Sequence, residues 1–190
     1  MQQLETRNAQ LRLSIVLGAL AMTLATPVTA QAQDEDRFEG AYMFVGGAKQ
    51  RQQREASIDS TVSQLNAIIR PFALRAFNKT TAVPSRIVFS RQGELLAIAL
   101  VPMPPRPSRV DGTPSEFVTV NGSTATLMRR HQGDRILETM SQRRGSRIIT
   151  YRLRPGGDVL DTSWRVEAPG VLETPLEFRL TYRRVGAGPQ

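Results

Sequence analysis

The chain has 190 residues, and its 25 lysines and arginines outnumber its 17 aspartates and glutamates, which gives a formal net charge of +8. It contains no cysteine and a single histidine, which excludes disulfide bridges, thiol catalysis and metal sites built from cysteine and histidine clusters. The basic balance favours anionic partners, so an anionic envelope surface is one partner that the charge suggests.

The first 32 residues have the pattern of a secretory signal peptide. Two arginines precede a mostly apolar run at 13–28, and small residues offer cleavage near Ala30 or Ala32. We expect segment 1–32 to be removed and the mature protein to be periplasmic or secreted. A retained membrane anchor is the alternative, but the run is short for a spanning helix and contains a glycine and a proline. No transmembrane helix is expected in the mature chain.

The mature sequence begins with a polar leader at 33–37, which we expect to be flexible. An alternating strand pattern follows from Phe38 to Val45, with Tyr42 and Phe44 on one face. Two consecutive glycines then break the strand.

The helical pattern of the chain lies at about 55–78. Apolar residues at helical spacing form one stripe, which we expect to be buried either as a lid over a barrel mouth or against the barrel wall: Ile58, Val62, Leu65 and Ile69. Pro71 divides the pattern, because the residue before a proline avoids helical geometry and proline suits a first helical turn. We therefore expect two consecutive helices.

The rest of the chain predicts an antiparallel meander. A hairpin pattern at 86–101 is followed by a loop at 101–116 with five prolines, which excludes a central strand there because proline cannot donate to a sheet. Six alternating runs separated by turns then follow: Phe117–Val120, Ser123–His131, Arg135–Ser141, Ser146–Arg154, Val159–Glu167 and Leu176–Val185. Strands this close in sequence pair with their neighbours, because parallel pairing needs a long crossover.

A long meander must close or cover its edges, and a barrel does so most simply. We predict a mainly β fold: a single antiparallel up-and-down β-barrel of about nine to ten strands with a two-helix insertion after the first strand. The barrel is expected to span 38–185, followed by a flexible tail at 186–190.

The segment Phe38-Glu39-Gly40-Ala41-Tyr42 resembles the opening F-x-G-x-W of fatty-acid-binding proteins and the G-x-W of lipocalins. Two helices between the first and second strands look like the portal helices of the fatty-acid-binding family, and the last three strand patterns are similar to its final strands. The chain thus resembles the calycin superfamily. This resemblance implies a barrel that binds a small hydrophobic or amphipathic ligand.

The chain departs from these families at two places. The fatty-acid-binding family holds a carboxylate with Arg-x-Tyr on one strand face, whereas Arg179 and Tyr182 are three residues apart and face opposite sides of a strand. That site is therefore not carried over. Tyr42 stands in place of the signature tryptophan, and the lipocalin resemblance implies that Arg183 or Arg184 packs against it.

Alternation sorts the predicted strands into an apolar inward face and an arginine-rich outward face. The candidate ligand-binding residues are the large side chains of the inward face: Tyr42, Tyr151, Trp164, Phe178, Leu180 and Tyr182. The same residues could equally fill a solid core. The arginine clusters, including Arg54 and Arg129, are interpreted mostly as a solvated outer surface.

Residues for catalysis are not apparent. His131 lies beside two arginines at a strand end and is interpreted as a surface residue. No metal, cofactor or nucleic acid is expected, and the protein is expected to be monomeric and not an enzyme. The leading hypothesis is an exported small-molecule carrier that binds an apolar or amphipathic, lipid-like ligand inside the barrel. The alternative is an envelope interaction or structural module with a filled barrel and a basic outer surface.

Overall fold

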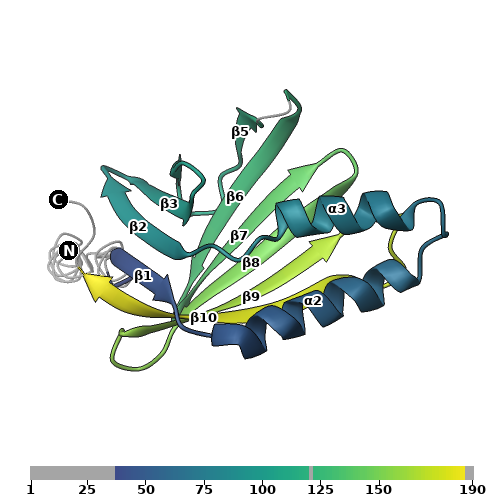
Figure 1. Ribbon diagram of the computed structural model, residues 1–190. Coiled ribbons are helices and arrows are strands. Elements are labelled where there is room, and N and C mark those ends of the chain that lie inside the picture. Colours follow the sequence, from purple (N-terminus) through teal and green to yellow (C-terminus); the bar gives the residue numbers. More distant parts are fainter. Residues whose placement is uncertain (1–36, 120–121, 187–190) are drawn as a thin grey trace, which may run out of the picture.

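The computed structural model describes residues 37–119 and 122–186 (Figure 1). The expected signal peptide, most of the expected leader, and residues 187–190 of the expected tail lie outside this range. The hypotheses about these segments therefore stay predictions.

One antiparallel sheet dominates the described residues (Figure 1). Its ten strands are β1 (Gly40–Phe44), β2 (Arg86–Gln92), β3 (Leu95–Val101), β4 (Arg106–Ser108), β5 (Ser115–Val118), β6 (Thr124–Gln132), β7 (Arg135–Gln142), β8 (Gly145–Leu153), β9 (Val159–Glu167) and β10 (Leu176–Gly186). They are ordered β4-β3-β2-β1-β10-β9-β8-β7-β6-β5. The first and last strands are thus neighbours, and the predicted mainly β fold with two inserted helices is confirmed.

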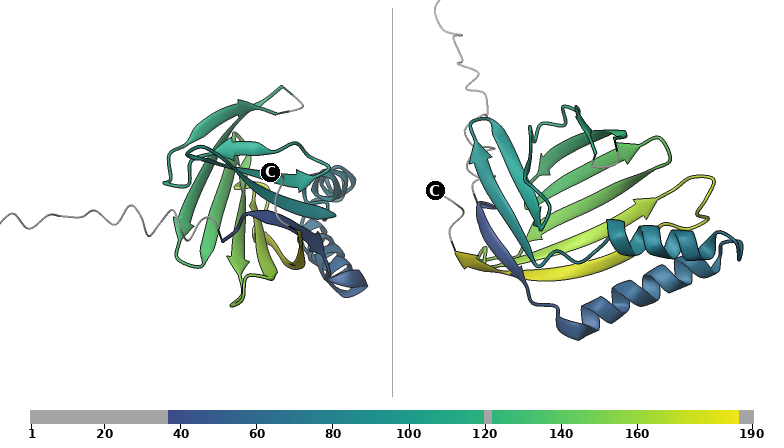
Figure 2. Two further views of the ribbon diagram at one scale, coloured as in Figure 1. Left: turned by 90° about the vertical axis from the view of Figure 1, so that its left-hand side faces the viewer. Right: turned by 45° about the horizontal axis from the view of Figure 1, so that its top comes forward.

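The two ends of the sheet approach each other and nearly close a barrel (Figure 2). The segment after β4 meets β6 through two backbone hydrogen bonds of 2.8 Å, from His131 N to Val110 O and from Gly112 N to Arg129 O. β4 contains Pro107 and lies at the sheet edge, where a missing N–H is tolerated. The expectation that the proline-rich loop holds no central strand is confirmed.

Alternation along the strands builds the core. In β10, Leu176, Phe178, Leu180 and Tyr182 are buried, whereas Glu177, Arg179 and Arg183 between them are exposed. Burial of an aliphatic or aromatic side chain contributes about 1.5–3 kcal/mol, so the inward face of each strand supplies the main driving force for closure.

The two helices are α2 (Gly47–Ser63) and α3 (Arg70–Thr80). They lie side by side, and α2 packs along β10 (Figure 2). α2 begins well before the expected start at residue 55. Where β1 ends, Gln50 of α2 takes the place of a neighbouring strand: its Oε1 accepts from Thr181 N at 2.8 Å, and its Nε2 donates to Thr181 Oγ1 at 3.0 Å. These hydrogen bonds to β10, beyond the end of β1, stabilise a helix whose residues are mostly polar.

Arg54 of α2 is buried and fixes α3. Its Nε donates to Thr81 O at 2.7 Å, and its terminal nitrogen donates to Asn78 O at 3.3 Å. These carbonyls belong to the C-terminal end of α3, where the helix dipole favours a cation. The interpretation of Arg54 as part of a solvated surface is wrong, because its guanidinium caps a neighbouring helix.

The expected apolar stripe is divided by the turn between the helices. Ile58 and Val62 lie in α2 and are buried, and Leu65 is buried just after the helix ends. Ile69 is 49% exposed, so the expectation that it is buried is wrong. α2 ends at Ser63, and in the turn that follows Asn66 Oδ1 accepts a hydrogen bond from Ile68 N at 2.9 Å. This turn separates Ile69 from the buried stripe of α2.

Neither helix of the described residues combines the length and apolar character needed to cross a membrane.

Candidate functional site

A charged cluster faces the barrel interior on β6, β7 and β8. Arg129 is directly opposite Glu138, and Arg147 is opposite Met140, one inward position closer to the β7–β8 turn. The side chains of Arg129, Glu138 and Arg147 are 1%, 5% and 8% exposed. The interpretation of Arg129 as a surface residue is therefore wrong.

Arg129 of β6 connects this strand to β3 and β4 at the other end of the sheet. Its guanidinium donates to Leu96 O at 2.6 Å on β3 and to Arg106 O at 2.7 Å on β4. It also donates twice to Glu138 Oε2, at 2.9 and 2.8 Å. The segment after β4 meets β6 through two backbone hydrogen bonds, and Arg129 adds two side-chain hydrogen bonds from β6 to β3 and β4, so its role is structural.

Arg147 is held less completely. Its terminal nitrogen lies 3.4 Å from Glu138 Oε1, and its guanidinium lies 5.5 Å from the centre of the Trp164 ring. Its Nε is buried and has no hydrogen-bond partner among the described residues. A buried donor without a partner is unfavourable by about 1–3 kcal/mol unless water or a ligand engages it.

The cluster carries an excess of positive charge. Three described arginines, Arg106, Arg129 and Arg147, surround the single described carboxylate Glu138. Burial and then the charge of Arg147 lower the pKa of Arg106. Burial raises the pKa of Glu138, but Arg129 and Arg147 outweigh it, so that its pKa lies below the usual value. The cluster would therefore attract an additional anion.

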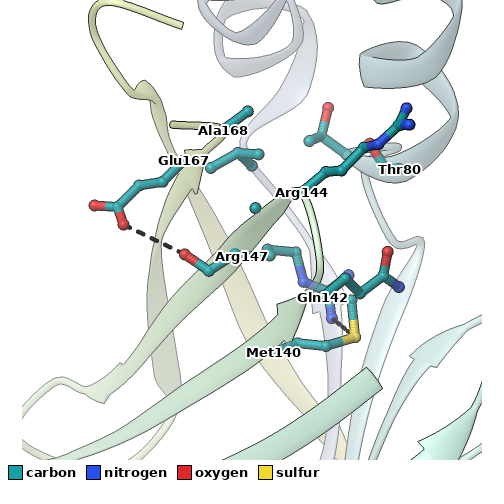
Figure 3. A pocket seen from close by; sticks show the side chains of 11 residues that line it. Thr80, Met140, Gln142, Arg144, Arg147, Glu167 and Ala168 are labelled. Atoms are coloured by element: carbon teal, nitrogen blue, oxygen red, sulfur yellow. Dashed lines mark hydrogen bonds between the residues drawn. The ribbon is translucent and has the colours of Figure 1, made fainter. Parts of the chain in front are cut away.

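A cavity of about 230 Å³ opens above this cluster, between the end of α3 and the β7–β8 turn (Figure 3). We call it the mouth pocket. Figure 3 shows Met140 and Arg147 on one side and Arg144 near Thr80 on the other. Its lining residues are Thr80, Thr81, Met140, Gln142, Arg144, Gly145, Ser146, Arg147, Val166, Glu167 and Ala168. Below Arg147, a cavity of about 10 Å³ has room for about one water molecule.

Two tyrosines predicted as ligand contacts bring further polar groups to the interior. The hydroxyls of Tyr151 and Tyr182 are buried and have no hydrogen-bond partner among the described residues. Burial, followed by the charge of Glu138, raises the pKa of Tyr151 well above its usual value, and burial also raises that of Tyr182. Both side chains therefore remain protonated and can donate hydrogen bonds.

Trp164, Phe178 and Leu180 are buried as the alternation predicted. The Trp164 and Phe178 rings stack with centroids 5.5 Å apart, and Trp164 Nε1 donates to Thr162 Oγ1 at 3.0 Å. Trp164 also contacts Arg147, which makes it a reporter of the mouth pocket. Their role in ligand binding stays a prediction.

Tyr42 belongs to another part of the interior. Arg184 lies 4.8 Å from the centre of its ring and donates to its hydroxyl, which in turn donates to Phe38 O at 3.1 Å. The expected packing of a late arginine against Tyr42 is confirmed for Arg184. Because the hydroxyl is engaged by the chain itself, we regard Tyr42 as a structural residue, and its predicted role as a ligand contact stays untested.

His131 is 8% exposed and its ring meets Phe38 edge-on, so its interpretation as a surface residue is wrong. Its position follows from the alternation of β6, which places residues 127, 129 and 131 on one face. The same alternation could have shown that Arg129 faces inward. Within residues 37–119 and 122–186, no group of three or more histidine, aspartate or glutamate side chains could hold a metal ion.

Comparison with known proteins identifies the fold. No family model and no curated protein matches the sequence. A luciferase domain from the dinoflagellate Lingulodinium polyedrum is 14% identical with a TM-score of 0.51, over 81% of this chain and 43% of that one. The chain thus spans less than half of that protein.

A secretary abundant heat soluble (SAHS) protein from Ramazzottius varieornatus is 8% identical with a TM-score of 0.51, over 78% of this chain and 96% of that one. A Schistosoma mansoni fatty acid binding protein in complex with arachidonic acid is 11% identical with a TM-score of 0.47, over 80% and 98% of the two chains. The fold is calycin-like, which confirms the resemblance at the level of architecture. At these identities the likeness concerns the fold alone.

Proposed function

We propose that the protein is a carrier that binds a small amphipathic anion in the mouth pocket. The anionic group binds Arg147, and the apolar part lies against Met140 and Val166. The observation that carries this proposal is Arg147, which lines the pocket and whose buried Nε has no hydrogen-bond partner among the described residues. An anionic oxygen there forms a charge-assisted hydrogen bond and offsets the excess positive charge of the cluster.

The size of the pocket limits the ligand. Its volume of about 230 Å³ lies below the roughly 300–1,000 Å³ of typical small-molecule sites. A short-chain or medium-chain carboxylate fits this size better than a long lipid. A longer ligand requires α3 to move, and α3 is held by Arg54 and by the buried Phe77.

The hydroxyls of Tyr151 and Tyr182 lie in the packed core and outside the lining of the mouth pocket, so a ligand would reach them only if core side chains moved. Both are protonated donors that lack partners within the described structure. They would orient a polar group at the inner end of the ligand. Apolar burial supplies most of the affinity, and these polar groups supply selectivity.

The carrier role includes no covalent chemistry, and we retain the expectation that the protein is not an enzyme. One structure with a similar fold is called a luciferase domain, so the fold by itself does not decide the matter. Export is also part of the proposal. The N-terminal sequence of the protein recovered from its host checks it: cleavage after Ala30 or Ala32 supports export, and an intact N-terminus contradicts it.

Fluorescence of Trp164 tests binding directly, because it is the only tryptophan in the chain. We would titrate the mature protein with octanoate and with octanol, which differ in the charge of the head group. Octanoate is expected to bind and octanol to bind at least about tenfold more weakly, since hydrogen bonds to charged groups contribute about 1.5–3 kcal/mol.

Substitution Arg147→Met should remove the preference for the carboxylate. Arg143→Met removes a positive charge from the adjoining turn outside the pocket lining, and it serves as the matched control. Equal losses in both variants would contradict the proposed role of Arg147. Failure of all probes, together with no mass released from the native protein on unfolding, would instead favour the filled barrel with a surface role.

A further inference from the structure

The outward face of β7, β8, β9 and β10 holds a cavity that is larger than the mouth pocket. Its volume is about 530 Å³. We call it the outer groove. It is lined by Gln50, Arg135, Thr150, Arg152, Arg154, Asp161, Ser163, Arg179 and Thr181. The volume falls within the roughly 300–1,000 Å³ typical of sites for small molecules.

Strand register builds the groove from two outward rows. In the first row, Arg135 is opposite Arg152, Arg152 is opposite Asp161, and Asp161 is opposite Thr181. In the second row, Thr150 is opposite Ser163, which is opposite Arg179. The short side chains of Thr150 and Ser163 leave a hollow beside the long arginines.

The hollow continues along the sheet. An adjoining cavity of about 310 Å³ shares Thr150, Ser163 and Arg179 with the outer groove and extends toward Arg165 and Glu177. A ligand longer than the outer groove could therefore follow the sheet in that direction. The three shared residues mark the centre of the site.

The charges of the outer groove are unbalanced. Like charges directly opposite on neighbouring strands are unfavourable, yet Arg135 and Arg152 are opposed in this way. Asp134 lies near both, at 2.5 Å from Arg152 and 3.5 Å from Arg135. Asp161 accepts two hydrogen bonds from Arg154, at 2.7 and 3.0 Å.

Arg179 completes the excess of positive charge. Its guanidinium forms no hydrogen bond or ion pair with the described residues, and the hydroxyls of Thr150 and Ser163 likewise find no partner there. The described charged groups in or beside the groove are four arginines and two aspartates: Arg135, Arg152, Arg154, Arg179, Asp134 and Asp161. The groove thus offers an excess of two positive charges together with unengaged hydroxyls.

We propose that the outer groove binds a phosphate monoester of a polyhydroxylated compound, that is, a sugar phosphate. A phosphate monoester carries close to two negative charges at neutral pH, which matches the excess. Guanidinium groups bind phosphate oxygens in a bidentate manner, and Arg179 is free among the described residues to do so. The hydroxyls of Thr150 and Ser163 suit the hydroxyls of the sugar. This site is separate from the mouth pocket and does not depend on the carrier proposal.

Calorimetric titration of the mature protein with glucose 6-phosphate tests the proposal. Inorganic phosphate and glucose are the two single-part probes. We expect saturable one-to-one binding of glucose 6-phosphate, weaker binding of phosphate and none of glucose. Added sodium chloride should weaken the binding because exposed charges are screened. An absence of saturation with glucose 6-phosphate would overturn the proposal.

Three variants distinguish specific binding in the outer groove from non-specific attraction to the positively charged surface. Arg179→Gln should weaken binding at least about tenfold, as expected for loss of a charge-assisted contact. Arg86→Gln makes the same change of charge at an exposed position of β2 and should leave the affinity unchanged. Ser163→Phe fills the hollow without changing the charge and should abolish binding.

Two further measurements distinguish loss of the binding site from misfolding of a variant. Arg179 and Ser163 are exposed, so both variants should keep the circular dichroism spectrum and the octanoate response of the wild type. If Arg86→Gln weakens binding as much as Arg179→Gln, the interaction is general electrostatic attraction and the proposal is wrong. If Ser163→Phe binds as the wild type does, the ligand lies elsewhere and the proposal is equally wrong.

Discussion

Arg147 and Arg152 occupy the same strand and face opposite sides of it, and their surroundings could hardly differ more. Arg147 is 8% exposed and shares one buried carboxylate with Arg129. Arg152 is 62% exposed and pairs with Asp134 in solvent. Inside the barrel a charge is stabilised by its ion-pair and hydrogen-bond partners, whereas outside the barrel it is stabilised mainly by water. The same residue type thus serves a fixed internal cluster and an accessible external groove.

The largest expected effect comes from removing the internal carboxylate. Glu138→Gln leaves Arg129 and Arg147 buried without a counter-charge, which should destabilise the fold by about 3–5 kcal/mol. Urea denaturation measures this loss. The control is Glu177→Gln, which removes an exposed carboxylate 2.7 Å from Arg165 and should change the stability far less. Similar losses in both variants would remove the distinction between inside and outside.

The next largest effect on stability is expected from a substitution in α2, which covers the interior together with α3. Ile58→Ala leaves a cavity beneath α2 and should lower the unfolding free energy by about 2–5 kcal/mol. It should also speed the release of octanoate in stopped-flow measurements, since α2 holds α3 over the mouth pocket. Gln53→Ala on the exposed face of α2 is the matched control. Unchanged release in Ile58→Ala would show that the helices do not act as a lid.

Lowering the pH should destabilise the folded protein through the internal cluster of Glu138, Arg129 and Arg147. The pKa of Glu138 in the folded protein lies below its ordinary value of 4.5, because Arg129 and Arg147 outweigh the effect of burial. A lowered folded pKa gives stability that is present above pH 4.5 and is lost as the pH falls through the folded value. Carboxyl NMR titration of Glu138 checks this, and a pKa above the ordinary value would contradict it.

The smallest effect is expected outside the barrel. Arg152→Gln removes an exposed ion pair with Asp134 and also relieves the repulsion between Arg152 and Arg135, so the melting temperature should barely change. Binding of glucose 6-phosphate should nevertheless weaken. A loss of stability comparable to that of Glu138→Gln would show that the outer groove is a structural cluster.

The alternation of β8, β9 and β10 was sufficient to predict the inward face, because Tyr151, Trp164 and Tyr182 follow the period of a strand. The same period places Arg129 and Glu138 inward, but the charge of Arg129 led to its interpretation as a surface residue, and Glu138 was not singled out. Their partnership depends on the register of β6 and β7, which the sequence does not display.

The start of α2 was missed for a different reason. Residues 47–54 are mostly polar and show no apolar stripe, and their helix depends on contacts such as Gln50 with Thr181 far along the chain. The mouth pocket was likewise beyond prediction, since it forms where α3 meets the β7–β8 turn. Both features depend on tertiary contacts between distant segments.

The pairing of β1 with β10 has a consequence for the order of events in folding. The two strands stand at opposite ends of the described chain, so their ladder closes a loop of nearly its full length. Contacts of such high sequence separation form slowly, because chain entropy must be lost before they contribute. The barrel cannot be completed until its last strand is available. A chain that crosses a membrane unfolded would benefit from this delay.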